Sequence, residues 1–459
     1  MKGTIYKTPE EVLRRAQEAI GLLLSQIDHT GRLKTGKGAI GTVIEESWFG
    51  YSPNNESEPD FPEAGIELKV TPYIRNSKGI RAKERLVCNI INYMTEYKKD
   101  FENSDFWHKC KRMLIMSYEY RPELTKANYQ IDQAILFSFP TEDLYIIKQD
   151  WNKIIAKIRS GQAHLITEGD TLYLAACAKG ATAQTVREQP FSPIPAKQRA
   201  YSLKSSYMTR ILNDFVFGNK TDEHIVKDPN ELANHTFEEY IINKIKPYYG
   251  FTQEQLKNKF GIHSNPKNLN AILLAKILGI KGIVSRSSEF QKAHIVLKTI
   301  RINKNDKIIE NMSLPQFKFM EIIQEDWEHS TLRNYLEPTK FLFVVFKESP
   351  QGQYILSDIK FWNMPITDLN EVKKVWEQTV RTIKEGIKTE IRGNKVYNNL
   401  PKSSDNPVAH VRPHAQNTSD IDLLPDGRKF PKQSFWLNNK YIAHIIQNKD
   451  YQCSYTEQK

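Results

Sequence analysis

One short segment alternates strictly between apolar and charged residues. Ile66, Leu68 and Val70 are apolar, and the two residues between them, Glu67 and Lys69, are charged. Because successive side chains of a β-strand point to opposite faces, this alternation predicts a strand whose apolar face packs on a core. Glu67 and Lys69 would then share the other face, so we expect a carboxylate and an ammonium in one cleft.

Helical spacing marks the segments that precede this strand. Thr8 and Pro9 are typical of the cap and the first position of a helix. Apolar residues follow at helical intervals, at Leu13, Ala16, Ile20, Leu23 and Leu24. A second helix is predicted to start within residues 38–45, which end in Glu45. Beyond the strand, helical and strand patterns mix without a regular βαβ alternation, so we expect an α/β fold of the α+β kind, a mixed sheet with flanking helices.

The second half of the chain repeats the first. Residues 100–104, with the sequence DFENS, are echoed by residues 326–330, with the sequence DWEHS. A tryptophan followed by a helical pattern that ends at Gly161 is echoed by a second such pattern that ends at Gly386. A repeat this long predicts two duplicated domains instead of a solenoid.

Length and composition agree with two domains. The chain has 459 residues, of which 39% are hydrophobic, and this is sufficient for two cores. The segment near residues 218–234 is polar and suits a connector. We therefore expect a catalytic domain over residues 1–220, a linker over residues 221–235 and a second domain over residues 236–459.

The strand with Glu67 and Lys69 carries candidate chemistry together with two acids that precede it. Six residues separate Asp60 from Glu67, and Glu45 adds a third carboxylate. Carboxylates are the hard oxygen ligands that Mg²⁺ prefers, and a bound ion keeps waters, one of which can attack a phosphodiester. Lys69 could orient that water. Taken alone the pattern also suits an exposed strand edge, where charged residues commonly alternate.

Several segments in the same order resemble one known family. They are residues 37–41 (KGAIG) before Glu45, Asp60 with residues 65–69 (GIELK), and residues 83–87, 89–93, 147–151 and 196–200. Together they resemble the active-site region of the mismatch-repair endonuclease MutH and, more closely, the Sau-type restriction endonucleases, which are MutH-like enzymes that cut GATC. The resemblance covers nearly the whole chain and implies two tandem MutH-like domains of the PD-(D/E)xK nuclease fold.

The resemblance also implies roles for single residues. Glu45, Asp60 and Glu67 would hold Mg²⁺, and Lys69 would position the attacking water. Residues 108–112 (HKCKR) resemble the family's His-Lys-x-Lys-Arg segment. On that basis Lys111 is the candidate second active-site lysine, and Lys109 and Arg112 are candidates for phosphate contacts. A charged helix surface is the alternative interpretation.

Residues that read DNA are also implied by resemblance. Residues 409–417, with Arg412 and His414, resemble the base-reading Arg-Pro-Lys loop of MutH, and the equivalent stretch of the first domain contains Lys179 and Gly180. Arginine and lysine can donate to guanine in the major groove. Tyr201 and Lys204 fall in a segment that resembles the family's Tyr-Leu-Lys run, with Ser202 inserted. Basic surface loops are the alternative.

The second copy has lost part of the acid set. Aligning the repeats places Val296 at the position of Glu67, Glu289 at that of Asp60 and Lys298 at that of Lys69. Valine cannot coordinate a cation. We therefore expect the second domain to be catalytically inactive and to bind DNA.

Charge and cysteine content restrict the setting of the protein. The net charge of +11 provides general attraction to phosphates. No apolar run approaches the ~20 residues of a membrane span, which favours a soluble cytoplasmic protein without a membrane partner. The four cysteines, at Cys88, Cys110, Cys177 and Cys453, lack the spacing of a disulfide framework or a zinc cluster, so we expect reduced thiols.

These expectations converge on a type II restriction endonuclease that uses Mg²⁺ to cut both strands of DNA at GATC. The family's habits add self-association on DNA and a companion methyltransferase that protects host DNA. Two alternatives stay open. One is a MutH-like repair enzyme that nicks a single strand, and the other is a non-enzymatic DNA-binding regulator.

Overall fold

The computed structural model of the chain divides into two compact units. The first unit contains residues 1–240 and 279–294, and the second contains residues 241–278 and 295–459. The residues described are 5–34, 39–52, 58–77, 79–180, 185–219, 223–393, 395–415, 417 and 419–448. Within the stretch expected to act as a linker, Ile225 and Leu232 are buried, and both belong to the first unit.

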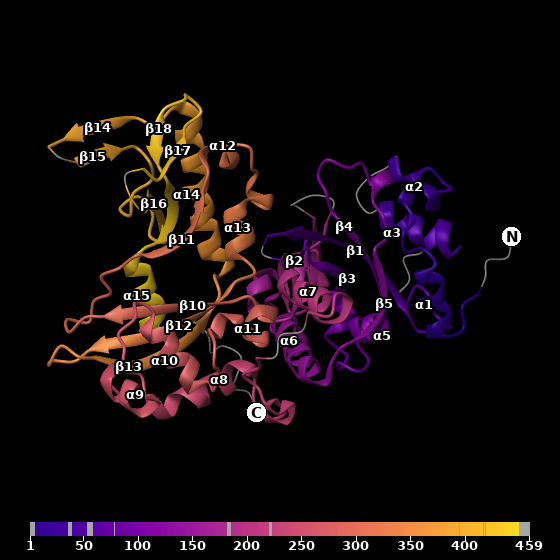
Figure 1. The fold of residues 1–459 in the computed structure, drawn as a ribbon, viewed down its shortest axis with the longest axis horizontal. Coiled ribbons are helices and arrows are strands. Elements are labelled where there is room, and N and C mark those ends of the chain that lie inside the picture. Colours follow the sequence, from indigo (N-terminus) through magenta and orange to yellow (C-terminus); the bar gives the residue numbers. More distant parts are fainter. Residues whose placement is uncertain are drawn as a thin grey trace. The chain divides into compact units, whose positions relative to one another are not determined.

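The first unit is built on a mixed sheet in the order β2-β1-β4-β5 (Figure 1). Its strands are β1 (Glu67–Asn76), β2 (Gly79–Ala82), β4 (Arg112–Glu119) and β5 (Gln133–Ser138). β1 runs parallel to β4 and antiparallel to β2, and β5 is antiparallel to β4. The strand predicted from alternation is therefore confirmed, with Ile66 and Leu68 buried.

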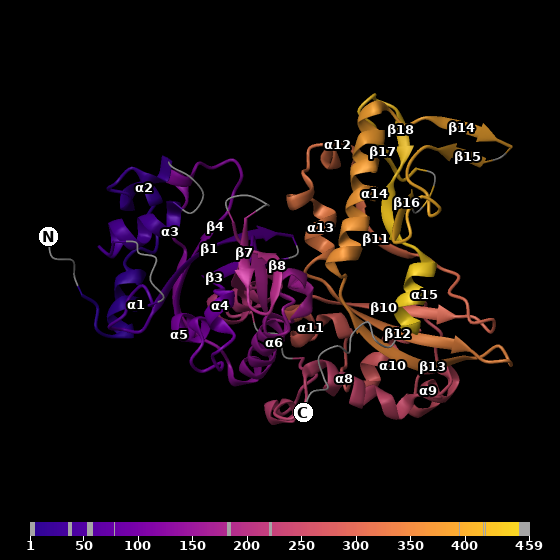
Figure 2. The same ribbon diagram turned by 180° about the vertical axis from the view of Figure 1, so that it is seen from behind.

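A second, three-stranded sheet and a hairpin complete the strands of this unit. The sheet has the order β3-β9-β6, and the hairpin is formed by β7 and β8 (Figure 2). Their bounds are β3 (Leu86–Ile90), β6 (Leu174–Ala178), β7 (Val186–Gln189), β8 (Ser192–Lys197) and β9 (Arg199–Leu203). β9 is antiparallel to both of its neighbours, so this sheet is wholly antiparallel.

The helices of the first unit begin where the sequence indicates. Thr8 caps α1 and its side chain accepts from the N–H of Glu11, with Pro9 in the first turn. α1 ends at Gln17, earlier than the apolar spacing suggested, and Leu24 begins a separate short helix. The helices are α1 (Pro9–Gln17), α2 (Leu24–Ile27), α3 (Ala39–Val43), α4 (Tyr93–Glu96), α5 (Asp105–Cys110), α6 (Thr141–Arg159), α7 (Ser205–Ile211) and α11 (Ser288–Ala293). α8 (Phe237–Ile245) crosses the boundary between the units.

The second unit has a similar strand arrangement, but the described part of its mixed sheet has three strands, without a counterpart of β2. One sheet has the order β10-β12-β13, with β10 parallel to β12, and the other has the order β11-β19-β16. The strands are β10 (Ile295–Ile302), β11 (Met312–Phe317), β12 (Lys340–Glu348), β13 (Tyr354–Trp362), β16 (Ala409–Pro413) and β19 (Gln433–Leu437). Two hairpins pair β14 (Thr389–Arg392) with β15 (Lys395–Asn398), and β17 (Ile421–Leu423) with β18 (Lys429–Pro431). The helices are α9 (Gln253–Phe260), α10 (Leu269–Ile277), α12 (Phe319–Ile322), α13 (Thr331–Leu336), α14 (Ile366–Glu385) and α15 (Asn439–Gln447).

The repeat inferred from sequence is therefore a repeat of topology. β1-β4-β5 corresponds to β10-β12-β13, β3-β9-β6 to β11-β19-β16, and the long helix α6 to α14. Registers agree as well, because Glu67 lies opposite Met113 on the parallel neighbour and Val296 lies opposite Phe341. Two tandem mixed-sheet domains with flanking helices are confirmed.

Each unit has its own apolar core. In the first unit, Val12, Ile44, Phe61, Ile66 and Leu114 are all fully buried in a cluster that joins the amino-terminal helices to the sheet. This packing anchors the segments that carry the candidate acids. In the described part of the chain, no helix combines the length and the apolar character needed to cross a membrane.

Candidate active site

A tight turn carries Asp60 alongside β1. Phe61 and Ile66 exchange two backbone hydrogen bonds, of 2.9 and 3.2 Å. Gly65 closes the turn with a φ of +64°, a left-handed conformation that glycine adopts without a steric penalty. The Asp60 Oδ2 then accepts from the N–H of Leu68 at 2.9 Å, and the N–H of Asp60 donates to Glu67 Oε2 at 3.3 Å. The turn therefore brings together two acids that are seven positions apart in the sequence.

Glu67 and Lys69 form an ion pair on the face predicted for them. Lys69 Nζ donates to Glu67 Oε1 at 2.6 Å and lies 3.5 Å from the carbonyl oxygen of Cys88. Burial works to lower the pKa of Lys69, but its surroundings, with the charge of Glu67 first among them, raise the pKa overall. The pKa of Glu67 is raised by its burial and by the charge of Asp60. Lys69 is therefore held in its ammonium form.

Glu45 is the third acid of the group. It lies in a π-helical turn, Ile44–Trp48, whose first residue is fully buried and fixes the turn to the core. Burial, followed by the negative charges of Asp60 and Glu67, raises the pKa of Glu45 to about 7. The charges of Asp60 and Glu67 therefore act on Glu45 in addition to its burial. We refer to Glu45, Asp60 and Glu67 as the acid cluster.

The acid cluster suits a hard cation in its chemistry. Its donors are carboxylate oxygens, and their excess negative charge would be relieved by a divalent ion. Among the residues that the structure describes, no group of three or more His, Cys, Asp or Glu side chains is spaced to hold a metal ion. Asp60 and Glu67 are instead bonded to the Leu68 N–H and to Lys69. If a cation bound, these carboxylates would exchange the hydrogen bonds for bonds to the cation.

Helix α5 supplies a second lysine to the cluster. Ser104 caps the helix by accepting from the N–H of Trp107. Lys109 Nζ lies 3.6 Å from Glu67 Oε2, and its charge also lowers the pKa of Glu45. Lys111, the predicted second lysine, is the exposed C-cap residue, and no ion pair joins it to the acids within the described residues. Arg112, at the start of β4, is also exposed.

Helical geometry explains why Lys109 faces the acids and Lys111 does not. Residues two positions apart on a helix point in nearly opposite directions, so only one of the two can face the acids. The two-residue spacing of Lys109 and Lys111 is visible in the sequence. The sequence does not show from which direction α5 approaches β1, and this direction decides which lysine faces the acids.

The residues predicted to contact DNA in the first unit occupy different environments. Lys179 is exposed, and its backbone exchanges hydrogen bonds with Gln198. Gly180 is also exposed, and a Cβ there would lie 2.5 Å from Thr185, so this position requires glycine. The rest of the equivalent loop, residues 181 and 182, and the start of the active-site resemblance, residues 37 and 38, lie outside the described residues.

Tyr201 and Lys204 are buried, in contrast to the DNA contact predicted for them. Tyr201 is fully buried and packs its ring 5.5 Å from that of Phe106. Lys204 is 3% exposed, and its Nζ donates to the carbonyl of Thr171 at 2.6 Å. Tyr201 lies on β9, the central strand of its sheet, and Lys204 follows that strand as the N-cap residue of α7. Neither side chain reaches a surface in this structure, so the contact prediction is corrected to a structural role.

In the second unit Arg412 lies at a surface beside an aromatic ring. Its guanidinium stands 4.8 Å from the ring centroid of Trp436, on the neighbouring strand β19. His414 is half-buried, and its Nδ1 lies 3.0 Å from the hydroxyl of Ser434. An exposed arginine held over a ring is oriented without losing its hydrogen-bond donors.

The positions of the second repeat that align with the acid cluster do not form a similar group of acids. Val296 replaces the central acid, and Lys298 donates to the carbonyl of Ser313 at 3.1 Å while burial lowers its pKa. Glu289, aligned with Asp60, is in the first unit, where it accepts from the N–H groups of Ile225 and Val226 at 3.1 Å. Glu289 therefore anchors the connector and is not a second Asp60.

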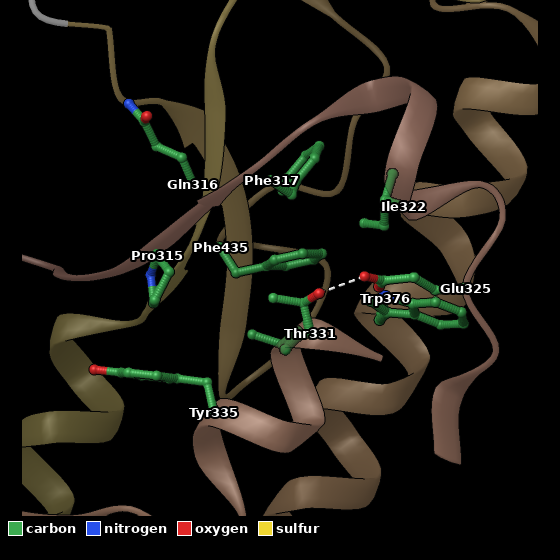
Figure 3. A pocket seen from close by; sticks show the side chains of 10 residues that line it. Pro315, Gln316, Phe317, Ile322, Glu325, Thr331, Tyr335, Trp376 and Phe435 are labelled. Atoms are coloured by element: carbon green, nitrogen blue, oxygen red, sulfur yellow. Dashed lines mark hydrogen bonds between the residues drawn. The ribbon is translucent and has the colours of Figure 1, made fainter. Parts of the chain in front are cut away.

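A small hollow in the second unit is lined by residues other than Val296, Lys298 and Glu289 (Figure 3). Its lining is mainly apolar, with Phe317, Trp376 and Phe435 among it, and Thr331 donates to Glu325 at its edge. The indole nitrogen of Trp376 is buried without a hydrogen-bond partner. In the first unit, Trp151 of the corresponding helix donates to Glu96.

Comparison with known proteins gives a consistent result. The family model described as DNA mismatch repair enzyme MutH matches residues 49–150 and 278–374, one segment in each copy. The type II restriction enzyme Sau3AI of Staphylococcus aureus is 38% identical, covering 96% of this chain and 99% of that enzyme.

MutH proteins themselves match about half of the chain. The DNA mismatch repair protein MutH of Shewanella woodyi is 32% identical, covering 45% of this chain and 92% of that protein, and one from Escherichia coli is 28% identical over the same shares. A relative that matches nearly end to end, together with a family model that matches in both halves, shows the family. The chain belongs to the MutH-like type II restriction endonucleases, site-specific deoxyribonucleases that act on DNA.

Proposed function

We propose that this enzyme uses Mg²⁺ to cut both strands of DNA at GATC, with the acid cluster of the first unit as its catalytic centre. The observation that carries the proposal is the convergence of Glu45, Asp60 and Glu67 beside Lys69. GATC as the site follows from the resemblance to the Sau-type endonucleases. The same resemblance supports a companion methyltransferase that protects host DNA.

The acid cluster would hold the cation through its carboxylate oxygens. A bound Mg²⁺ would neutralise charge on the scissile phosphate and polarise a coordinated water. Lys69, which donates to Glu67, would orient that water. Lys109 adds a second ammonium near Glu67, where it can stabilise the charge that develops on the phosphate oxygens.

The second unit would bind DNA without cutting it. Val296 removes the central acid, and Lys298 is bonded to a backbone carbonyl, so no carboxylate of that strand could bind a cation. Arg412, exposed and oriented by Trp436, is the candidate base-reading residue of this unit. Each chain would then hold one catalytic centre, and two chains would associate on DNA to cut both strands of a symmetric site.

The presence of one acid cluster per chain also favours a second candidate, an enzyme that only nicks one strand. The two can be separated by their products. A nicking enzyme converts supercoiled plasmid to open circles and no further, whereas a double-strand endonuclease also yields linear fragments.

The test is digestion of an unmethylated plasmid of known sequence with Mg²⁺ or with a chelator, followed by sequencing of the ends. We expect linear fragments that end at GATC only when Mg²⁺ is present.

Glu67→Ala should lower the cleavage rate by at least about a thousandfold while sparing most of the DNA affinity, because it removes a cation ligand and not a groove contact. The exposed Glu63 provides a matched control, and Glu63→Ala should cut normally. Cleavage by Glu67→Ala at near the original rate would refute the site.

A further inference from the structure

A strongly basic hairpin extends from the strand of the candidate active site. β1 and β2 form this hairpin, and the chain leaves it toward β3. Residues 75–85 contain five basic residues and one acid, Glu84. Arg85 pairs with Glu168, and Lys78 lies outside the described residues. The other three basic residues are exposed, and we call them the hairpin cations: Arg75, Arg81 and Lys83.

The hairpin cations are not neutralised by acids. Within the described ranges, no ion pair joins any of them to a carboxylate. Aromatic rings hold two of them instead. The guanidinium of Arg75 lies 5.6 Å from the ring centroid of Phe217, and Lys83 Nζ lies 4.0 Å from that of Tyr120. A cation that stacks on a ring is oriented and keeps its N–H donors for an anion.

α7 and the helical turn that follows it fix the hairpin from one side. Thr209 Oγ1 accepts from the N–H of Ala82 at 3.0 Å, and Asn213 Nδ2 donates to the carbonyl of Ile80 at 2.9 Å. Ile80 and Ala82 are buried, whereas Arg81 between them is exposed. Because side chains alternate along a strand, Arg81 points away from the face on which Ile80 and Ala82 are buried.

The corresponding turn of the second unit is nearly balanced in charge. Residues 301–310, at the end of β10 and beyond it, contain three basic residues and two acids. Both acids are paired, Glu310 with Arg301 at 2.8 Å and Asp306 with Lys347 at 2.7 Å. The excess of exposed cations is therefore a property of the first unit and does not follow from the shared topology.

The hairpin cations lie far from the acid cluster along β1. The N–H of Lys83 donates to the carbonyl of Pro72, five residues beyond Glu67, and Arg75 is eight residues beyond it. At about 3.3 Å per residue of strand, these separations are about 17 and 26 Å. A site of four base pairs is only about 14 Å long. Cations at this separation would face DNA outside the site that is cut.

We propose that the hairpin cations bind the backbone phosphates of the duplex DNA that flanks the recognition site. The proposal rests on the function proposed for the acid cluster, since that cluster sets the position of the cut. DNA is the polyanion on which this enzyme acts, and exposed arginine and lysine side chains attract its phosphates whatever the sequence. The hairpin lengthens the stretch of duplex that the first unit holds without changing which sequence is read.

The experiment measures DNA binding by the full-length protein at several salt concentrations, with a chelator present so that no duplex is cut. The parent protein and Arg81→Ala/Lys83→Ala are compared on a duplex with about 14 base pairs on each side of GATC and on one with about 3. On the long duplex we expect the double variant to lose at least about tenfold in affinity at about 50 mM salt. The slope of log affinity against log salt should become shallower by about two, because two phosphate contacts are lost. On the short duplex the two proteins should bind within about twofold of each other.

A matched variant removes the same amount of charge from the second unit. Arg301→Ala/Lys347→Ala also deletes two exposed cations, but both of these are paired with acids. Its salt slope on the long duplex should differ from that of the parent by less than about one half. The ratio of affinities for GATC and for an altered sequence should be the same in all three proteins, because phosphate contacts carry no sequence information.

Three results would overturn the proposal. One is an unchanged salt slope on the long duplex, which is expected if the cations only keep the edge strand β2 from pairing with other chains. The others are an equal loss of affinity on the short duplex and an equal loss in Arg301→Ala/Lys347→Ala. Failure of the acid cluster as the catalytic centre would show separately, as cleavage by Glu67→Ala, and would leave these binding measurements unaffected.

Discussion

At the scale of single residues, the candidate site depends on a buried acid that never touches the phosphate. Glu96 is fully buried beneath α5 and accepts from the indole nitrogen of Trp151 at 3.5 Å and from the N–H of Asp105 at 3.4 Å. Lys99 lies 3.6 Å from it. Burial, and then the neighbouring Asp105, raise the pKa of Glu96 to about 7. Glu96 therefore links the first turn of α5 to α6. Its ionisation lowers the stability of the folded protein, so that stability depends on pH.

The sign of that dependence follows from linkage. Because the folded pKa exceeds the ordinary 4.5, the stability that Glu96 contributes is complete below pH 4.5 and is lost as the pH rises through about 7. Glu96→Gln mimics the protonated acid and should raise the free energy of unfolding by about 1–2 kcal/mol at pH 8, with no gain at pH 4.5. Thermal unfolding at the two pH values is the measurement. Glu102→Gln, at an exposed acid of the neighbouring loop, serves as control, and an equal gain there would contradict the account.

At the scale of elements, the position of one short helix decides which lysine takes part. α5 packs its buried face, Phe106 and Cys110, inward, and Lys109 leaves the helix toward Glu67. Lys111 caps the helix and is exposed. The same motif therefore contains one lysine for the acid cluster and one for the surface.

This division predicts unequal effects of two alanine substitutions. Lys109→Ala should lower the single-turnover cleavage rate by about a hundredfold, because it removes a cation beside the developing negative charge. Lys111→Ala should change that rate by less than about threefold and should weaken DNA binding slightly, as expected for an exposed phosphate contact. Rates are measured at saturating enzyme, with affinities obtained separately. The reverse order of effects would return the role to Lys111.

At the scale of the whole molecule, the chain contains two copies of one topology with different chemistry. Both copies keep a parallel pair of strands, β1 with β4 and β10 with β12, but only the first has an acid, Glu67, on its leading strand. The second copy keeps an exposed arginine, Arg412, over Trp436. Such a pair of domains suits one unit that cuts and another that binds.

The binding role of the second unit can be tested through Arg412. Arg412→Ala should reduce the stimulation of cleavage by added GATC duplex by about tenfold, the size of one lost bidentate base contact. The sequence specificity of the first unit should not change. Arg428→Ala is a matched control, since Arg428 is exposed but paired with Asp426. An unaltered response of Arg412→Ala to added duplex would eliminate this role for the arginine.

Local patterns predicted much of the fold because they report local physics. Alternation identified β1, the Thr8 cap identified α1, and the repeated segments identified two domains. Sequence spacing was a weaker guide to which side chains meet. Tyr201 and Lys204 lie in a motif associated with DNA, yet both are buried. Tyr201 lies on the central strand β9, and Lys204, just before α7, donates to the Thr171 carbonyl.

The sequence by itself determined that this chain has a carboxylate and a lysine on one face of a strand, two acids before it, and a second copy in which the central acid is a valine. These properties depend only on residue type and on the period of a strand or a helix. Tertiary structure alone decided that Lys109 and not Lys111 meets Glu67, and that Glu289 anchors the connector. Those contacts join segments far apart in sequence or depend on the direction of a helix, and no local periodicity encodes how separate elements are packed.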